Sequence, residues 1–290
     1  MNLRVKYQYK YPAKVPDRPK LRITYDRIKE GTIAIRETVT EEIEITPSYV
    51  SEEGAWLFES PYKSLLSQSG AEHLPDENLV LEFLFQEGGG DVLHDSSRYG
   101  NNGKIYGASW VDLGNGRYGL SFDGIDDYVR VAYNSLFDLT NEGTVLLLIY
   151  PLQSTQRHDM YGRYNNSQHR FSTVGKGTGG SLRFHWYANG SVYYVDSIGG
   201  IELNRWNFAG VMWKYNSSGY KIWFVFDDQI EEHYVSSPQM DVITNDVTIG
   251  YTFEWFKGII TLACIYNRVL TESEIKSRYE QLKQIFPELG

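Results

Sequence analysis

Aromatic and planar polar side chains gather in two segments of the sequence, QRHDMYGRYNNSQHR at 156–170 and TFEWFKG at 252–258. Flat rings can stack on the C–H surface of a sugar, while guanidinium, imidazole and carboxylate groups hydrogen-bond its hydroxyls. Both segments are typical of exposed loops, although their aromatic residues could instead pack under their own loops or against a neighbouring subunit. The candidate ligand-binding residues are Arg157, His158, Asp159, Tyr161, Arg163, Tyr164, Glu254 and Trp255.

A second group of oxygen-bearing side chains lies in the string DSSRYGNNG, where Asp95, Asn101 and Asn102 occur close together. Carboxylate and amide oxygens are the ligands that calcium prefers in proteins. The same residue types also form tight turns. The cluster is therefore a weak candidate for a calcium site, with turn formation as the alternative, and no other cofactor is indicated.

Motifs of known catalytic chemistry are missing from the sequence. Neither G-x-S-x-G nor H-E-x-x-H occurs. The string GKGTGG at 175–180 precedes an alternating strand pattern rather than a helix, so it predicts a hairpin loop and not a phosphate site. The single cysteine, Cys264, lies in an apolar run that predicts a buried residue. We expect a protein that is not an enzyme.

Composition narrows the class of protein further. The chain has 290 residues, of which 15% are aromatic, and its 27 glycines favour strands and turns. A net charge of -9 argues against nucleic acid as a partner. No signal peptide is visible, and the longest uncharged apolar run, 144–152, is about half the length of a membrane helix, so no membrane insertion is expected.

Two regions are expected, with a boundary between residues 75 and 76. Six of the nine prolines and only three of the 27 glycines precede it, and residues 1–75 carry 11 basic and 11 acidic side chains. Three short alternating stretches, 20–28, 31–39 and 41–47, predict strands that are too few and too polar for a core of their own. Residues 1–75 are therefore predicted to be an extended, β-rich arm that docks on other copies or on coat or tail proteins, with a flexible extension as the alternative.

The second region, 76–290, predicts a two-sheet antiparallel sandwich of the all-β class. Short strands recur along it at the spacing of a jelly roll, and Asn189-Gly190 marks a two-residue hairpin. One helix is expected near the C-terminus, where Thr271 and Glu274 form a capping box, and we expect it to lie across a sheet edge. The predicted strands are 79–85, 119–122, 128–133, 144–150, 170–174, 181–188, 191–195, 206–213, 220–227, 231–237, 247–251 and 259–266.

Alternation along these strands predicts which side chains enter the core. In SFDGIDDYVRV we expect Phe122, Tyr128 and Val131 to face the core across a hairpin. In NRWNFAGVMW we expect Trp206 and Phe208 to lie inside the sandwich rather than in a binding site.

Four strings, read in order, resemble the successive blocks of a laminin G-like, concanavalin A-type lectin domain over about residues 78–283. They are LVLEFLFQEGGGDVLHDSSRYGNNGKIYGASWV, GLSFDGIDDYVRV, NRWNFAGVMW and VTIGYTFEWFKGIITLACIYNRVLTESEIKSRYE. The resemblance implies a jelly roll that binds glycans or proteins, sometimes through calcium. An acidic pair often present in the family is replaced here by Thr261-Leu262, which argues against calcium, and the E-x-D-x-x-E string of the related glucanases is absent.

A surface-binding domain without a visible export signal is typical of a virus or phage particle, which assembles in the cytoplasm. The sequence thus favours a non-enzymatic virion surface protein whose lectin-like domain attaches to glycans or cell-surface polysaccharide, or contributes to particle architecture. A cellular extracellular binding module is the alternative, and a glycoside hydrolase is the third possibility.

Overall fold

The computed structural model describes residues 20–29, 35–44, 76–152, 158–163, 169–176 and 179–289, and for 20–29, 35–44 and 169–176 it gives the strand backbone. The chain divides into two compact units, Met1–Ser64 and Leu65–Gly290. The domain boundary predicted between residues 75 and 76 falls beside undescribed residues and stays a prediction.

The first unit contains a two-stranded antiparallel ribbon. Strand β1 (Lys20–Lys29) pairs with β2 (Ile35–Glu44) over ten residues each, from Lys20 opposite Glu44 to Lys29 opposite Ile35. The predicted break near residue 40 is wrong, because one continuous strand runs through it. The charged residues of EEIE interrupt the apolar pattern there without interrupting the backbone pairing.

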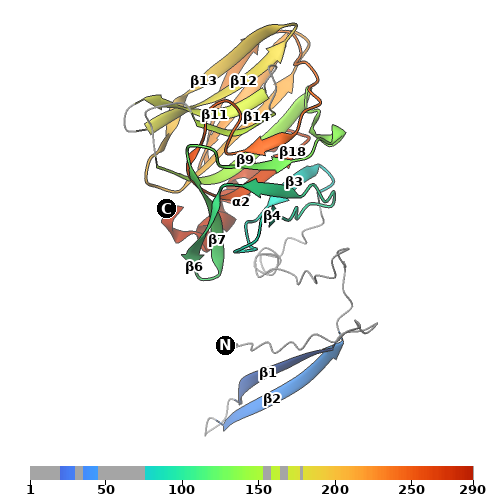
Figure 1. Ribbon diagram of the computed structural model, residues 1–290, viewed down its shortest axis with the longest axis vertical. Helices are drawn as coiled ribbons and strands as arrows, with labels where there is room; N and C mark the ends of the chain where they lie inside the picture. Colours follow the sequence, from blue (N-terminus) through green and yellow to red (C-terminus); the bar gives the residue numbers. More distant parts are fainter. Residues whose placement is uncertain are drawn as a thin grey trace. The chain divides into compact units, whose positions relative to one another are not determined.

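The second unit is a sandwich of two eight-stranded antiparallel sheets, and the predicted all-β jelly roll is confirmed (Figure 1). Sheet I has the strand order β13-β12-β11-β10-β17-β8-β5-β4. Its strands are β4 (Val92–Leu93), β5 (Gly103–Tyr106), β8 (Tyr128–Val131), β10 (His158–Arg163), β11 (His169–Lys176), β12 (Gly179–Ala188), β13 (Ser191–Glu202) and β17 (Val247–Ile249).

Sheet II has the order β16-β15-β14-β9-β18-β7-β6, and β3 also pairs with β18. Its strands are β3 (Leu79–Phe83), β6 (Ser109–Gly114), β7 (Arg117–Asp123), β9 (Glu142–Pro151), β14 (Asn207–Tyr215), β15 (Gly219–Phe226), β16 (Gln229–Ser236) and β18 (Lys257–Tyr266). Two single-turn 3-10 helices, η1 (Ser135–Phe137) and η2 (Pro287–Leu289), complete the unit.

The core lies between the sheets and is rich in aromatic rings. Phe184 of sheet I stacks on Trp213 of sheet II at a centroid distance of 4.8 Å, and Trp186 meets Tyr220 edge to face at 5.5 Å. Burying one such side chain stabilises the fold by roughly 1.5–3 kcal/mol. The sheets thus hold each other in a fixed orientation, and the strand backbones become a rigid base for residues on the outer faces.

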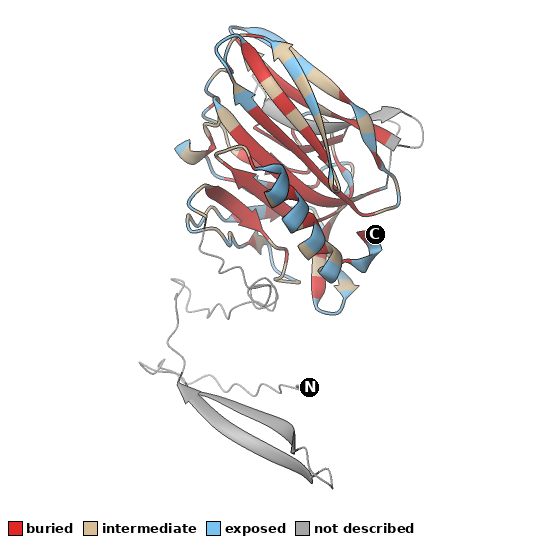
Figure 2. Ribbon diagram, turned by 180° about the vertical axis from the view of Figure 1, so that it is seen from behind, coloured by how far each residue is buried: buried red, intermediate tan, exposed pale blue. Residues whose placement is uncertain are grey.

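The predicted C-terminal helix is present as α2 (Glu272–Ile285). The capping box is confirmed: the Thr271 side chain accepts a hydrogen bond from the backbone N–H of Glu274, and the Glu274 side chain accepts one from that of Thr271. The predicted position at a sheet edge is wrong, because α2 packs on the outer face of sheet II, where Tyr279 lies 6.3 Å from Phe208 of the central strand β14 (Figure 2).

Two further expectations concern single side chains. Phe122 and Val131 are buried in the core. Trp206 and Phe208 are buried as predicted, but not inside the sandwich: they lie on the outer side of sheet II, against Phe286 and Tyr279. Tyr128 does not face the core: it is half-buried on the outer face of sheet I, because Val129 occupies the inward position of β8.

The Asn189-Gly190 hairpin is confirmed, since both residues have positive φ between β12 and β13. Among the described residues, no helix is long and apolar enough to cross a bilayer.

Candidate functional site

The first predicted ligand-binding segment is not a loop where the structure describes it. Residues His158–Arg163 form strand β10, which pairs with β11 on one side and β17 on the other. A bulge between Asp159 and Tyr161 turns the consecutive residues Met160 and Tyr161 both into the core. Such a bulge removes the period-2 signal of a strand, which explains the wrong prediction. Arg157 and Tyr164 lie outside the described residues.

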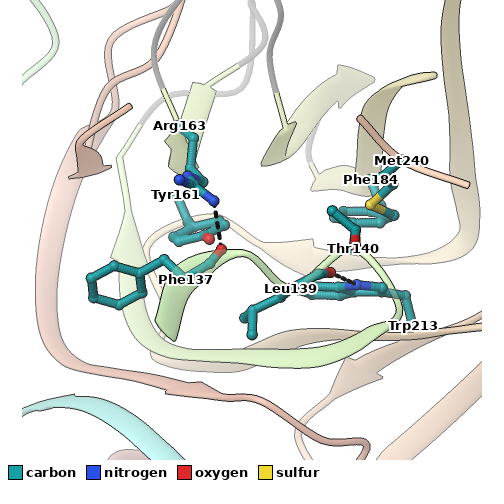
Figure 3. Close-up of a pocket in the computed structure, with 8 residues that line it drawn as sticks. All are labelled: Phe137, Leu139, Thr140, Tyr161, Arg163, Phe184, Trp213 and Met240. Atoms are coloured by element: carbon teal, nitrogen blue, oxygen red, sulfur yellow. Dashed lines mark hydrogen bonds between the residues drawn. The ribbon is translucent and has the colours of Figure 1, made fainter. Parts of the chain in front are cut away.

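Arg163 is a structural side chain rather than an exposed ligand. It is 2% exposed and donates from Nη1 to the carbonyl of Phe137 at 2.5 Å (Figure 3). The same nitrogen donates to Asp138 Oδ1 at 3.0 Å. Its Nε and Nη2 both donate to the carbonyl of Asn245 at 3.3 Å. Arg163 thus joins η1 and the segment before β17 to strand β10.

Tyr161 and Arg163 line a small cavity between the sheets. The volume of this cavity is about 20 Å³, enough for one water molecule and far below the several hundred Å³ of ordinary ligand pockets. Burial raises the pKa of Tyr161 to about 12, so its hydroxyl stays protonated. The structure therefore places these two predicted residues in the interior, beside a cavity too small for a sugar. The other lining residues are Phe137, Leu139, Thr140, Phe184, Trp213 and Met240 (Figure 3).

The two predicted segments do meet, through the first two residues of β10. The buried carboxylate of Asp159 accepts hydrogen bonds at Oδ2 from the backbone N–H groups of Phe253, at 2.8 Å, and Glu254, at 3.1 Å. His158 donates from Nδ1 to the carbonyl of Trp255 at 2.7 Å. Asp159 and His158 thus position the 251–256 loop.

A glycine lets this loop lie flat on the sheet. Gly162 is in the middle of sheet I, and a Cβ atom added there would lie 2.0 Å from Oγ1 of Thr252. Thr252 itself is fully buried. Any side chain at position 162 would lift the loop from the outer face of sheet I.

The loop completes a group of four aromatic side chains, which we call the aromatic platform: Tyr106, Tyr128, Tyr251 and Trp255. Tyr251 stacks on Trp255 with centroids 3.7 Å apart and planes 15° apart, and Tyr106 stacks on Tyr128 at 4.7 Å and 8°. Tyr128 joins the two stacks, since it lies 6.0 Å from Tyr251 and 6.1 Å from Trp255. Tyr106 is 37% exposed and the other three are half-buried, so the platform reaches solvent.

Of the platform residues, only Trp255 was a sequence candidate, and Glu254 lies beside it in the loop. Tyr106 and Tyr128 are directly opposite each other in the β5–β8 register. Tyr106 follows the core residue Ile105, and Tyr128 precedes the core residue Val129. The sequence signal that could have identified these two tyrosines is the alternation within KIYG and YVRV. It places both on the outer face once Val129 is assigned to the core.

Three carboxylates adjoin the platform. Asp123, Asp126 and Asp127 each offer an oxygen within 4.8 Å of the other two. Asp127 lies against Gly107, the residue after Tyr106, and accepts a hydrogen bond from the backbone of Asp123 at 2.7 Å. Burial raises the pKa of Asp127. Such oxygens can accept hydrogen bonds from hydroxyl groups, and they are also of the type that binds a hard cation.

The predicted calcium candidates have other partners. The carboxylate of Asp95 accepts four hydrogen bonds: from the backbone of Glu82, Ser97 and Asn101 and from the Ser97 hydroxyl, at 2.6–2.9 Å. The Asn102 side-chain oxygen accepts from the Asp95 backbone at 2.9 Å. The Asn101 side-chain oxygen accepts from Asn134 Nδ2 at 3.1 Å. These side chains fit a loop anchored by protein hydrogen bonds, and they do not fit a calcium site that needs their oxygens free.

Residues 123–276 match the family Laminin_G_3, described as the concanavalin A-like lectin/glucanases superfamily. This match covers more than half of the chain. The chain belongs to this superfamily. The matched residues run from the last residue of β7 into the first turns of α2, and they include three of the four platform residues. A search of curated proteins finds no match.

Solved structures agree on the fold of this superfamily member. Domain 4 of AbnA, a GH43 extracellular arabinanase from Geobacillus stearothermophilus, superposes with a TM-score of 0.54 at 17% identity, over 69% of this chain and 97% of that domain. The binding domain of botulinum neurotoxin DC superposes with a TM-score of 0.54 at 13% identity, over 72% and 52%. The botulinum neurotoxin type G receptor binding domain gives 0.52 at 16%, over 70% and 51%. The chain thus spans about half the length of the neurotoxin domains.

Proposed function

We propose that residues 76–290 form a glycan-binding domain without catalytic activity, and that the aromatic platform is its binding surface. The observation that carries the proposal is the exposure of stacked rings on a rigid sheet. Aromatic faces that are fixed before binding cost little conformational entropy when a sugar stacks on them. In this proposal the carboxylates of Asp123, Asp126 and Glu254 accept hydrogen bonds from the hydroxyl groups of the same ligand.

The relatives in fold support a binding role. The arabinanase domain is described in complex with arabinotriose, and the neurotoxin DC binding domain both in complex with rat synaptotagmin II and in complex with SialylT. These proteins thus include one in complex with a sugar and one in complex with a protein. For this chain, the aromatic platform favours a sugar, because its flat faces suit pyranose and furanose C–H surfaces.

The proposal extends to the biological setting as a virion surface protein. The support is the combination of a lectin-like domain with a separate N-terminal unit containing the β1–β2 ribbon, which suits attachment to a larger assembly. In this role the domain attaches the particle to host glycans, and residues 1–75 link it to the particle.

Binding to an immobilised glycan array, followed by calorimetry on the best ligand and on arabinotriose, tests the proposal. Trp255→Ala is expected to weaken binding at least tenfold, because it removes one face of the platform, about 1.4 kcal/mol of stacking energy. The matched control is Trp223→Ala: Trp223 is a half-buried tryptophan on sheet II, where it donates to Glu232. Equal loss in both variants, or no bound glycan, would contradict the assignment.

A separate assay tests the proposal that the domain has no catalytic activity. Incubating the protein with each glycan that binds, and following reducing ends over a day, is expected to show no turnover. Turnover that disappears in Asp127→Asn, while binding persists, would instead establish the glycoside hydrolase.

A further inference from the structure

The ribbon of β1 and β2 is long for a sheet of only two strands. Ten residues of each strand are paired, and among the described residues no third strand pairs with either outer edge. An isolated two-stranded ribbon is marginally stable in water and gains stability from further strands or from a partner on one face. With respect to the described strands, both edges also present backbone N–H and C=O groups without a ladder partner, which are templates for strand addition.

The register divides the ribbon into two unlike faces. Alternate residues of a strand lie on the same face, so Leu21 opposite Ile43 and Tyr25 opposite Val39 belong to one face. Ile23 lies between them in β1. The other face contains Lys20 opposite Glu44, Arg22 opposite Glu42 and Thr24 opposite Thr40. One face thus carries six apolar residues together with the charged residues Arg27, Lys29, Glu37 and Glu41, and the other face is polar apart from Ile28.

The two strands carry opposite charge. Strand β1 has four basic residues and one acidic residue, a formal charge of +3. Strand β2 has one basic residue and four acidic residues, a formal charge of -3. The outer edge of β1 is thus complementary in charge to the outer edge of β2. Within one ribbon these edges point away from each other, so they can meet only between different copies.

We propose that the ribbons of several copies of this chain pair edge to edge, with β2 of one copy antiparallel to β1 of the next, and close into a small ring. Head-to-tail contacts of this kind form a ring when the rotation between neighbours closes. Closure removes both free edges. The inference concerns the first unit alone, so it stands or falls independently of glycan binding by the second.

A set of charge-reversed full-length chains tests the edge pairing. Variant A carries Lys20→Glu, Arg22→Glu and Arg27→Glu, which changes β1 from +3 to -3. Variant B carries Glu44→Lys, Glu42→Lys and Glu37→Lys at the three directly opposite positions, which changes β2 from -3 to +3. Variant AB combines all six changes and restores complementarity, with the signs exchanged.

Native mass spectrometry gives the expected results. The unchanged chain forms an oligomer of one defined copy number, A and B are monomers, and AB forms the same oligomer as the unchanged chain. When AB, mass-tagged, is refolded together with the unchanged chain, mixed oligomers are at least tenfold rarer than random mixing gives. In the unchanged chain and in AB alike, the two strands of one ribbon carry opposite charge. A preference of each chain for its own kind therefore reports contacts between copies and not contacts within a ribbon.

Three outcomes would overturn the inference. A monomeric unchanged chain at 100 µM, by light scattering, excludes pairing between copies and leaves another protein as the partner of the ribbon. Random mixing of AB with the unchanged chain shows that the copies associate through another surface. A broad series of masses without a fixed copy number shows open filaments instead of a ring.

Discussion

Asp95 illustrates how one carboxylate organises a loop of this protein. Its two oxygens accept hydrogen bonds from β3, through Glu82, and from the 97–101 turn. Hydrogen bonds to a charged group typically contribute more than neutral ones, and each backbone donor would be left unsatisfied without it. At the scale of single residues, the string that suggested calcium is therefore explained by the folding of the loop.

Asp95→Ala is expected to lower the free energy of unfolding by about 3 kcal/mol, because four partly buried donors lose their acceptor. Urea denaturation measures the change, and the same loss is expected in EDTA and in calcium. Asp112→Ala is the control, since exposed Asp112 accepts one local hydrogen bond from Gly114, and its cost should stay below about 1 kcal/mol. A calcium-dependent difference between Asp95→Ala and the unchanged protein would restore the metal site.

At the scale of elements, helix α2 depends on the charge of its capping residue. The side-chain hydrogen bonds from Arg268, at 2.7 and 3.0 Å, together with those from Thr271, lower the pKa of Glu274 to about 2. Arg268 also donates to Asp76 at 2.6 Å, so the start of the helix is joined to the segment that leads into β3. The helix is thereby fixed on sheet II from its first turn.

A lowered pKa in the folded state makes this contribution depend on pH. It is complete above the unfolded pKa of Glu274, near 4.5, and is lost as the pH falls toward 2. Glu274→Gln is expected to cost about 1 kcal/mol at pH 7, a value reduced for solvent screening, and almost nothing at pH 2. Urea midpoints at the two pH values measure this, with Glu280→Gln on the exposed side of α2 as control. A cost that is the same at both pH values would show that the charge is not involved.

The free edge of sheet I is protected by a side chain from sheet II. Strand β13 is the last strand of sheet I, and Glu231 of β16 accepts hydrogen bonds from the backbone of Ile198 at 2.6 Å and Gly199 at 2.8 Å. Ile198 is 91% exposed beside these bonds. Without the carboxylate, the edge would offer free N–H donors next to an apolar side chain, which favours strand addition.

Glu231→Ala is therefore expected to aggregate faster, while its folded structure is retained. Light scattering at 37 °C over a range of concentrations measures the rate, and an increase of several-fold is expected. Glu232→Ala is the control, because the adjacent Glu232 bonds only side chains, Trp223 and Lys221. Equal rates in the two variants would mean that the carboxylate does not protect the edge.

These elements also show what the sequence predicts and where it fails. Periodic strands, the Asn189-Gly190 turn and the Thr271 capping box are local signals, so they were predicted correctly. Strand β10 was missed because its bulge hides the alternation, and the platform was missed in part because Tyr106 and Tyr128 meet only through strand pairing. The number of hydrogen bonds on Asp95 likewise depends on residues distant in sequence, which no local pattern reveals.

At the scale of the whole molecule, the two units have separate tasks in our proposals. A chain beginning at residue 76 keeps Asp76, the partner of Arg268, and is expected to fold, to remain monomeric and to bind a single glycan as the full chain does. Its binding to a dense glycan surface should be weaker by a factor of 100 or more, because linked sites bind with avidity, on the order of 10²–10⁴. Surface plasmon resonance at high and low glycan density compares the two chains. Equal binding of the two chains at high glycan density would show that oligomer formation does not strengthen attachment.

Cys264 gives this protein a practical property. It is the single cysteine, it is fully buried beneath α2, and burial raises the pKa of its thiol to about 12. Because thiolates, and not thiols, react with maleimides, the native protein should remain unlabelled at neutral pH. A cysteine introduced at Phe253, which is 59% exposed in the loop that holds the platform, would then be the only reactive thiol. The native sequence is thus already a background for fluorescent or spin labels that report, from one known position, when the platform is occupied.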